Sequence, residues 1–440
     1  MLFQNLKLGT HAPAKMATYA FTLFLASIAH AKDLYVATNG SDAVSYSTNS
    51  ISTPWKSLNH AMYNLQAGDH LYIRGGTYKP NYPIFLADDY TSKNSGGDPT
   101  QTMSAQSGTS SQTVIIENYN SETVTVDLSS MTDSFIYLDN KSYWTFRGLN
   151  FVNSLQVFMV GENSPTKYIT FENLNVVANR GGDNRAAIHL ENGNADYITV
   201  KGCNLTGPGQ AVHQNTSTIY ANRTMHLSVL NNTLSNAPIG IYFKLPHSAT
   251  SSSQTALEVA GNKFSSTGRA SIENNTAYVN IHDNAFGGGS TYINLGEDFR
   301  GDSNIIAHNT FLDGSVNVLA TTATNNTIAN NIIMKSLIVL RYVSTSISTT
   351  LQRNLYTSSS SLLSMTTKME STALVGTPMF VGGANPSTLP QYALASTSIG
   401  RAAATDGTDI GLRVTSTSSS PTAPATTSPP SAPSLSVQIQ

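Results

Sequence analysis

One pattern recurs in VLNNTL (229–234), VAGNKF (259–264), IHDNAF (281–286), IAHNTF (306–311), IANNII (328–333) and LQRNLY (351–356). Each segment has an apolar residue, two spacers, an asparagine, one spacer and a second apolar residue. Three earlier segments at 146–151, 171–176 and 200–205 keep the pattern but place Leu149, Leu174 and Cys203 where asparagine stands later. The period runs from 22 to 30 residues. This repeat predicts a solenoid, in which a coil buries its apolar residues only by stacking on its neighbours.

The strands within each repeat are expected to be short. They are rich in Val, Ile, Phe and Tyr, they are bounded by Asn and Gly, and no helical run separates them. This pattern excludes leucine-rich and helical solenoids and predicts an all-β fold, a parallel β-helix of roughly ten coils. The recurring asparagine is expected to bond backbone groups at a tight bend and to stack on the amide of the next coil.

The N-terminal part of the chain is expected to cover the apolar end of this solenoid. Residues 34–36 read as a strand, and Thr53-Pro54 opens a helix with apolar residues at 58, 61, 62 and 65 that stops at Gly68. We expect this helix to be the cap, because the first coil has no neighbour on its outer side. Residues 87–112 lack periodicity and predict a long loop leaving the stack, and regular coils resume at 114–116.

Composition and termini indicate an exported protein. Only 11% of the 440 residues are charged and the net charge is −2, which gives no reason to expect nucleic acid or a membrane as partner. Residues 16–31, MATYAFTLFLASIAHA, predict a signal peptide, with translation starting at Met1 or Met16. We therefore expect a signal peptide at 1–31, one catalytic β-helix domain at 32–414 and a disordered Ser/Thr/Pro-rich tail at 415–440, in an extracellular or periplasmic protein. The single cysteine, Cys203, is expected to be a small buried residue.

The N-terminal segments LYVATNGSD (34–42) and STPWKSLNHAMYNLQAGDHLYIRGGTY (52–78) precede the asparagine repeat, and YALASTSIG (392–400) and DGTDIGLRV (406–414) close it. In this order they resemble secreted right-handed parallel β-helix proteins, especially polysaccharide lyases of the pectate, alginate and chondroitinase B types. The resemblance covers roughly residues 33–414 and is specific for the fold. It implies a monomer that binds an acidic polysaccharide along one outer sheet and cleaves it at uronic acids.

Alternation along the strands predicts which side chains face outward. Aligning AIHLEN (187–192), QAVHQ (210–214), IGIYFKLPH (239–247), ASIEN (270–274) and YINLGEDFR (292–300) coil by coil gives one polar stripe. Its expected members on successive coils are Glu191, His213, Tyr242 and Lys244, Glu273, and Glu297 and Asp298. Alternation also predicts that His189, Tyr292 and Asn294 face outward. Such a stripe is informative in a chain with so few charges, and the longest coils, whose extra loops can wall a groove, lie in the same region.

Cleavage of a uronate polymer by β-elimination needs a group that neutralises the sugar carboxylate, a base for the C5 proton and a proton for the leaving oxygen. Lys244 is the first choice for the base, and Tyr242 and His213 are the next candidates for base or acid. Arg269 or Arg300 could clamp the carboxylate. A lone outward lysine is usually only solvated, so Lys244 stands as a hypothesis.

Three acidic residues are candidates for a calcium site, because Ca²⁺ prefers oxygen ligands. They are Glu273, Glu297 and Asp298, although the last two can equally form a charged turn. Further side chains near the stripe are candidate substrate contacts: His189, Glu191, Arg185, Arg223, His247, Glu273 and Arg300.

Two other function classes remain open. A glycoside hydrolase on the same fold would use two carboxylates, which Glu273 with Glu297 or Asp298 could supply. A binding or adhesive β-helix would show aromatic residues along its groove without a Lys, His and acid cluster. Among lyase substrates alginate is favoured and pectate comes next, because the chain shows neither a strongly basic groove nor a recognisable calcium motif of pectate lyases.

Overall fold

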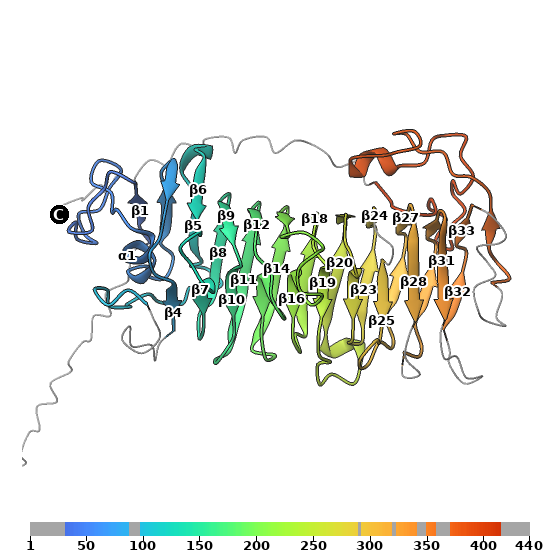
Figure 1. Cartoon of the computed structure of the whole chain (residues 1–440), viewed down its shortest axis with the longest axis horizontal. Helices are drawn as coiled ribbons and strands as arrows, with labels where there is room; N and C mark the ends of the chain where they lie inside the picture. Colours follow the sequence, from blue (N-terminus) through green and yellow to red (C-terminus); the bar gives the residue numbers. More distant parts are fainter. Residues whose placement is uncertain are drawn as a thin grey trace, which may run out of the picture. The chain divides into compact units, whose positions relative to one another are not determined.

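The computed structural model describes residues 31–87, 97–288, 292–318, 323–340, 349–357 and 370–414. The expected signal peptide, apart from Ala31, and the expected tail lie outside these ranges. The described residues form a parallel β-helix in which successive strands of the chain add to three sheets in turn (Figure 1). The prediction of this architecture from the repeat is confirmed. No helix in the described ranges has the length and apolar character needed to cross a bilayer.

Three sheets, which we number in the order that a coil visits them, contain 12, 12 and 10 described strands. Sheet 1 consists of β1 (Asp33–Val36), β2 (His70–Ile73), β5 (Val114–Asn118), β8 (Ser142–Arg147), β11 (Thr166–Glu172), β14 (Ala195–Lys201), β17 (His226–Leu230), β20 (Ala256–Ala260), β23 (Val279–His282), β26 (Ile305–Ala307), β29 (Thr327–Ala329) and β32 (Thr350–Gln352). Sheet 2 consists of β3 (Gly76–Tyr78), β6 (Val124–Asp127), β9 (Asn150–Ser154), β12 (Asn175–Ala178), β15 (Asn204–Thr206), β18 (Thr233–Ser235), β21 (Lys263–Ser265), β24 (Ala285–Gly287), β27 (Thr310–Phe311), β30 (Ile332–Ile333), β33 (Leu355–Tyr356) and β34 (Leu374–Val375). Sheet 3 consists of β4 (Ile84–Leu86), β7 (Ser134–Leu138), β10 (Gln156–Val160), β13 (Ala186–Leu190), β16 (Ser217–Ala221), β19 (Ile239–Phe243), β22 (Ala270–Asn274), β25 (Ile293–Leu295), β28 (Gly314–Val318) and β31 (Ser336–Leu340).

The core lies inside the coils, where the inward apolar residues of each strand stack on their equivalents in the next coil. In sheet 1 Phe146 pairs with Phe171, and Phe171 with Val200, and all three are buried. In sheet 3 Phe158 pairs with Ile188 in the same way. The apolar residues of the repeated segments are therefore the inward residues that the sequence predicts.

The asparagines form a hydrogen-bonded ladder between sheets 1 and 2. At Asn262 the backbone N–H and Nδ2 both donate to Oδ1 of Asn284, at 2.8 and 3.0 Å, and Nδ2 also donates to the backbone carbonyl of Val229 at 2.8 Å. The same backbone and Nδ2 donation to the next Oδ1 recurs from Asn232 to Asn331. The last donors, on Asn354, bond the buried carboxylate of Glu370 at 2.8 and 3.0 Å. We call this array the asparagine ladder.

The residue before each ladder position has a positive φ, because the chain turns sharply from sheet 1 to sheet 2. In the early coils this position alternates between glycine and asparagine. A Cβ on Gly261 would lie 2.2 Å from Oδ1 of Asn231, and Gly261 has φ +65°. Glycine is required here both by the close approach and by the left-handed backbone.

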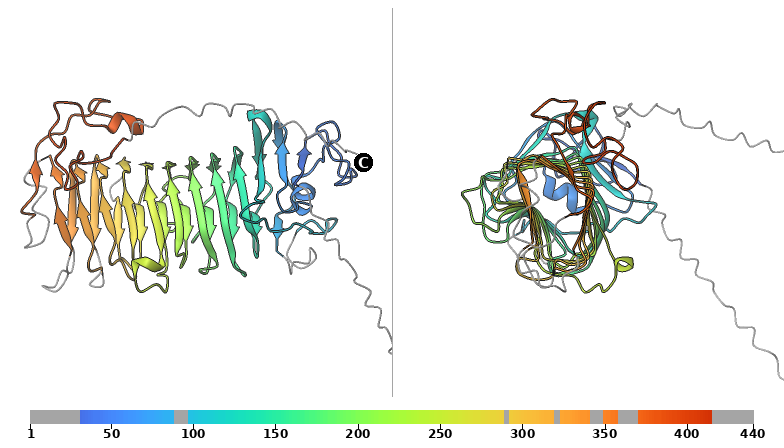
Figure 2. Two further views of the ribbon diagram at one scale, coloured as in Figure 1. Left: turned by 180° about the vertical axis from the view of Figure 1, so that it is seen from behind. Right: turned by 90° about the vertical axis from the view of Figure 1, so that its right-hand side faces the viewer.

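The N-terminal end is covered by one short helix, α1 (Leu58–Tyr63), capped by Ser57 rather than opened at Thr53-Pro54. Leu58, Ala61 and Met62 of α1 are buried against the stacked coils (Figure 2). Part of the expected loop at 87–112 lies outside the described residues, but its described part does not leave the stack. Ser104 donates to the carbonyl of Tyr63 at 2.8 Å, so this segment packs beside the helix.

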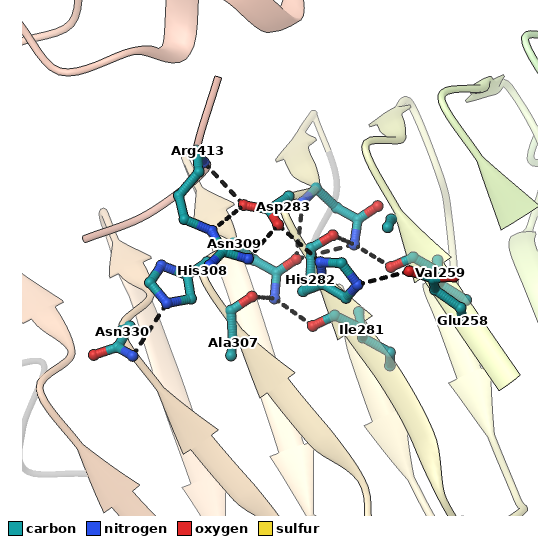
Figure 3. A network of polar contacts seen from close by, with 12 residues as sticks. Glu258, Val259, Ile281, His282, Asp283, Ala307, His308, Asn309, Asn330 and Arg413 are labelled. Carbon is teal, nitrogen blue, oxygen red and sulfur yellow. Dashed lines mark hydrogen bonds and ion pairs between the residues drawn. The ribbon is translucent and has the colours of Figure 1, made fainter. Parts of the chain in front are cut away.

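The C-terminal residues fold back across the turns between sheets 1 and 2. Arg413 donates through its backbone N–H and its guanidinium to Asp283, and the Nε to Oδ1 distance is 2.9 Å (Figure 3). Asp283 also contacts His282 at 2.8 Å. One coil further on, His308 lies 3.3 Å from Asp406. The C-terminal segment is thus pinned by polar side chains at positions that glycine or asparagine occupies in earlier coils.

Candidate functional site

Six polar residues gather at the outer face of sheet 3, on or beside three successive strands, with Arg269 directly before β22. We call them the Lys244 cluster: Tyr242, Lys244, Arg269, Glu273, Glu297 and Asp298. Tyr242 lies on β19 and Glu273 on β22, at paired positions, and Lys244 follows β19 directly. Regular stacking of the coils brings these residues together although 56 positions separate the first from the last.

Lys244 is a partly exposed basic residue of the cluster, with 23% of its side chain accessible. Its Nζ donates to the hydroxyl of Tyr242 at 2.7 Å and lies 3.6 Å from Oδ2 of Asp298. Burial raises the pKa of Tyr242, and the nearby carboxylates of Glu273 and Asp298 raise it further. The phenol therefore stays protonated at neutral pH and acts as a fixed partner for the lysine.

Arg269 contacts acidic residues of two neighbouring coils. Its NH2 nitrogen lies 2.8 Å from Oε1 of Glu273 and 3.1 Å from Oε2 of Glu297. Burial raises the pKa of Glu273 to about 8, although Arg269 opposes the shift. Oε2 of Glu273 is buried and has no hydrogen-bond partner within the described part of the chain. With its pKa near 8, Glu273 is largely protonated at neutral pH, so Glu297 is the other carboxyl group in contact with the Arg269 guanidinium.

Three asparagines hold this arrangement, and one of them, Asn294, is among the residues expected to face outward. Asn215, in the turn before β16, accepts from Arg269 NH1 at 3.0 Å. Asn317 donates to Asn294 at 2.9 Å, and Asn294 in turn donates to Glu297 at 3.4 Å. Asn294 and Asn317 occupy the register position of Glu273 in the next two coils.

The prediction that the side chains of the stripe are exposed to solvent is partly wrong. Alternation holds, but Tyr242, Glu273 and His189 are buried on the outer face of sheet 3 rather than solvated. Tyr242 packs with Tyr220, Ala186 and Ile239, because outward side chains of neighbouring coils stack closely and cover one another. Asn294 is likewise buried, and Tyr292, expected outside, belongs to the main core.

His213 does not lie in the stripe. The strand of its coil is β16, so Tyr220 occupies the position that QAVHQ was expected to fill. His213 is an exposed turn residue whose Nδ1 lies 3.5 Å from Asp183, near the N-terminal end of β16 rather than at the end where Lys244 lies. Its coil has extra residues before the strand, and this shifted the alignment.

His189 and Glu191 form a second polar group two coils before Lys244. His189 Nε2 contacts Oε2 of Glu191, and its Nδ1 lies 3.1 Å from Gln156 Oε1. Asn222 donates to Oε1 of Glu191 at 2.5 Å. Burial opposes ionisation of Glu191, but the bonds from His189 and Asn222 hold its pKa below the ordinary value.

The remaining candidate substrate contacts are dispersed. Arg185 pairs with Asp133 at 2.8 Å, and Arg223 is an exposed turn residue next to Asn222. Arg300 is bound to Asp302 at 2.7 Å, and His247 is buried with its Nε2 3.0 Å from the carbonyl of Ala277. Arg300 and His247 are therefore engaged in structural contacts outside the Lys244 cluster.

The expected calcium ligands do not fit a calcium ion in this conformation. The guanidinium of Arg269 lies between Glu273 and Glu297, and Lys244 faces Asp298, so basic groups stand where the cation would be. Among the described residues no three His, Cys, Asp or Glu side chains are arranged to hold a metal. The positive charge at this site therefore comes from Arg269 and Lys244.

Two pockets of about 290 and 330 Å³ lie away from the Lys244 cluster. The first is bounded by Asp283, Arg413 and Pro390 near the C-terminal segment, and the second by Lys56, Lys79 and Tyr82 near α1. A polymer that lies along an outer sheet needs an open surface rather than an enclosed pocket, so we place the candidate site at the cluster.

Comparisons with known proteins agree with the fold. Residues 34–205 match the family model described as the Pel9A-like right-handed beta helix region. The pectate lyase PEL9 of Emericella nidulans is 26% identical over 137 residues, which are 28% of this chain and 28% of that protein. The chain thus matches less than a third of the length of this curated relative.

Solved structures extend the likeness in fold. The pectate lyase Pel9A has a TM-score of 0.55 at 15% identity, covering 87% of this chain and 96% of that one. A rhamnogalacturonan lyase has a TM-score of 0.52 at 12% identity, covering 73% and 87%. The family match ends at residue 205, before Lys244. The Lys244 cluster is therefore defined by its distances in the structure and not by the family match. The fold is a right-handed parallel β-helix, and the resemblance to the β-helix polysaccharide lyases is confirmed.

Proposed function

We propose that the protein is a secreted polysaccharide lyase that cleaves a uronate-containing polysaccharide by β-elimination. The observation that carries the proposal is Lys244, which is partly exposed beside the end of β19, donates to a buried tyrosine and faces Asp298. Arg269 contacts Glu297, the residue next to Asp298. The pectate lyases among the similar proteins support the reaction class and favour pectate over alginate.

In the proposed reaction Lys244, in its neutral form, takes the proton from C5 of the uronate. The electron pair left on C5 forms the C4=C5 double bond, and the bond from C4 to the leaving oxygen breaks. Water supplies the proton to that oxygen. Arg269 neutralises the sugar carboxylate, which lowers the energy of the carbanion-like transition state.

Tyr242 has a positioning role in this scheme. It is fully buried, so it cannot reach the sugar, but its hydroxyl accepts the hydrogen bond from Lys244 and fixes the direction of the amine. Glu273 is also fully buried and lies beside Arg269. Burial of Glu273 argues against the glycoside hydrolase alternative, because both carboxylates of a hydrolase flank the scissile bond.

Incubation with pectate, alginate and chondroitin, followed by the ultraviolet absorbance of unsaturated uronate products, tests the proposal. We expect absorbance to rise with one of these polymers, and Lys244→Ala to lower the rate at least about a hundredfold. Lys263→Ala is the matched control, since Lys263 is a surface lysine of sheet 2 that bonds the carbonyl of Ser387. New reducing ends without the absorbance would show hydrolysis and sink the proposal.

The choice between Arg269 and a calcium ion is tested in the same assay. Chelation by EGTA should leave the rate unchanged if Arg269 neutralises the carboxylate, whereas Arg269→Ala should lower it strongly. Loss of activity with EGTA, restored by added Ca²⁺, would assign the neutralisation to a cation instead.

A further inference from the structure

A row of aromatic side chains runs along the outer side of sheet 1, a different sheet from that of the Lys244 cluster. Its members stand directly before the paired inward residues of β8, β11, β14 and β17, and they are Tyr143, Tyr168, Tyr197 and His226. Successive ring centroids lie 4.5, 4.8 and 4.0 Å apart, with interplanar angles of 13°, 22° and 6°. Neighbouring rings therefore cover each other's faces. The edges of Tyr168 and Tyr197 stay open to solvent, since 39% and 41% of these residues are exposed.

A row of hydroxyl side chains lies beside the aromatic row. It stands two residues further along the same strands and consists of residues that pair with one another in register, Thr145, Thr170, Thr199 and Ser228. All of them are partly exposed, so their hydroxyls are available to donate and accept hydrogen bonds at the surface. We call the two rows together the sheet 1 face. Its groups repeat at the coil spacing of about 4.8 Å.

The tyrosines of the sheet 1 face occupy a backbone conformation that is unfavourable for a bulky side chain. Tyr143, Tyr168 and Tyr197 have φ values of 59°, 58° and 53°. In this left-handed region the Cβ crowds the following carbonyl oxygen, and glycine or asparagine is normally found. The corner between sheets 1 and 2 follows that rule with Asn173 and Gly202. Ring stacking offsets part of the cost but does not require exposed rings, so the recurrence of tyrosine in three coils points to a function of the exposed edges.

The charged residues around the sheet 1 face balance one another. Four are basic and four are acidic: Arg147, Lys167, Lys201, Arg223, Glu117, Glu172, Asp196 and Glu258. Most of them form ion pairs, as in the 3.0 Å contact of Arg147 with Glu117 and the 3.2 Å contact of Lys201 with Glu172. Because neither sign is in excess, the face has no net attraction for a polyanion such as a polyuronate.

We propose that the sheet 1 face binds an extended, uncharged polysaccharide that lies along the solenoid axis. Sugar hydroxyls bond the hydroxyl row, and the apolar C–H groups of the sugars pack against the ring edges. Successive sugars of an extended chain advance by a step similar to the coil spacing, so each sugar meets equivalent groups. This site goes beyond the proposed lyase activity. It holds the protein on a neutral polymer, whereas the proposed reaction at the Lys244 cluster needs a uronate.

Native electrophoresis in gels that contain a soluble polysaccharide tests the proposal, because binding slows migration. The probes are hydroxyethyl cellulose, galactomannan and polygalacturonate, and every protein carries Lys244→Ala so that no probe is cleaved. We expect at least one neutral polymer to slow the protein, and polygalacturonate to slow it less. Tyr168→Asn combined with Tyr197→Asn should raise the dissociation constant for that neutral polymer about tenfold or more. Asparagine tolerates the positive φ, so these substitutions add no backbone strain.

Two further variants keep the result independent of folding. Thr170→Val combined with Thr199→Val leaves the stacked rings intact and should weaken binding severalfold, because the hydroxyls are lost. Tyr82→Asn is the matched control and should leave binding unchanged, since Tyr82 is 40% exposed but lines the pocket near α1. Urea unfolding midpoints are measured for every variant.

The proposal is overturned if neither neutral polymer slows the protein, or if both double variants bind as tightly as their parent. A lower unfolding midpoint of the tyrosine variant with unchanged binding would assign the rings a structural role only. Loss of a dimer in gel filtration, without an effect on polysaccharide binding, would assign the face to contacts between copies of this chain. The lyase proposal is judged separately, from unsaturated products formed by the protein with Lys244 intact, so the two can fail independently.

Discussion

Replacing Asn284 by alanine removes one rung from the middle of the asparagine ladder, and we expect the folded state to lose about 2–5 kcal/mol. Oδ1 of Asn284 accepts from the backbone N–H and the Nδ2 of Asn262, at 2.8 and 3.0 Å. Its Nδ2 donates to the carbonyls of Val259 and His282, both at 2.8 Å, and to Asn309 Oδ1 at 3.0 Å. All these contacts vanish together in the variant.

The expected magnitude is dominated by groups left unpaired. The N–H of Asn262 is buried and loses its acceptor, which costs about 1–3 kcal/mol. The carbonyl groups lose a donor but keep part of their bonding in the sheet. A void of three side-chain heavy atoms adds about 1–2 kcal/mol, because the stacked coils cannot collapse into it.

Urea unfolding followed by far-ultraviolet circular dichroism measures this loss as a shift of the midpoint at constant slope. Asn204→Ala is the matched control. Asn204 is exposed on sheet 2 and makes one side-chain bond, to Asn175 at 2.8 Å, so its loss should change stability by less than about 0.5 kcal/mol. A loss below about 1 kcal/mol for Asn284→Ala would refute the view that the ladder stabilises the fold.

Three further changes test other features. Gly261→Ala should destabilise the fold by about 2 kcal/mol in the same assay, because its Cβ would lie 2.2 Å from Asn231 Oδ1. Glu273 has a pKa raised to about 8, so the stability that its neutral form confers is present below about pH 4.5 and is lost as the pH rises toward 8. Glu273→Gln should flatten this part of the pH profile of the unfolding free energy. Arg413→Ala removes the bonds to Asp283 and should speed limited proteolysis of the C-terminal segment severalfold.

Each of these changes has its own control. Gly407 has φ +79°, and a Cβ added to it would meet no atom within 4 Å, so Gly407→Ala shares the backbone strain without the clash. Equal effects at the two glycines would contradict the role of close packing. An unaltered pH profile in Glu273→Gln would show that another group titrates. Arg401→Ala removes a more exposed arginine from the same C-terminal region and should leave proteolysis nearly unchanged.

The fold could be predicted from the sequence because each coil of a solenoid repeats the same spacing of apolar residues along the chain. The first apolar residue of each segment from Phe146 to Ile328 was identified by the repeat alone and is buried, whereas Leu351 in the last segment is partly buried. The capping helix was expected to open at Pro54 but starts at Leu58, since Ser57 accepts the capping bond from His60. Boundaries of this kind depend on single hydrogen bonds that apolar periodicity does not report.

The sequence predicted which residues form the candidate site better than it predicted how deeply they are buried. Lys244, Arg269 and Glu273 were all identified, and the structure brings them together, while their roles stay predictions. Alternation could give the direction of Tyr242 and Glu273 but not their burial, which depends on neighbouring coils. His213 was wrongly placed on a strand because extra residues precede β16 in its coil. The number of residues between the ladder position and the sheet 3 strand is therefore larger in this coil than the alignment assumed.

The asparagine ladder has a direction, and this limits how the array can be lengthened. Each rung gives its donors to the following rung and receives from the preceding one, until Glu370 accepts from Asn354 with a carboxylate and offers no donor onward. A duplicated unit of 22 residues, the spacing of Asn309 and Asn331, can be inserted between two rungs with each donor still meeting an oxygen. Past Glu370 an added rung would find a carboxylate, which has no side-chain donor to offer, so the side-chain ladder continues only where a unit is inserted before Glu370.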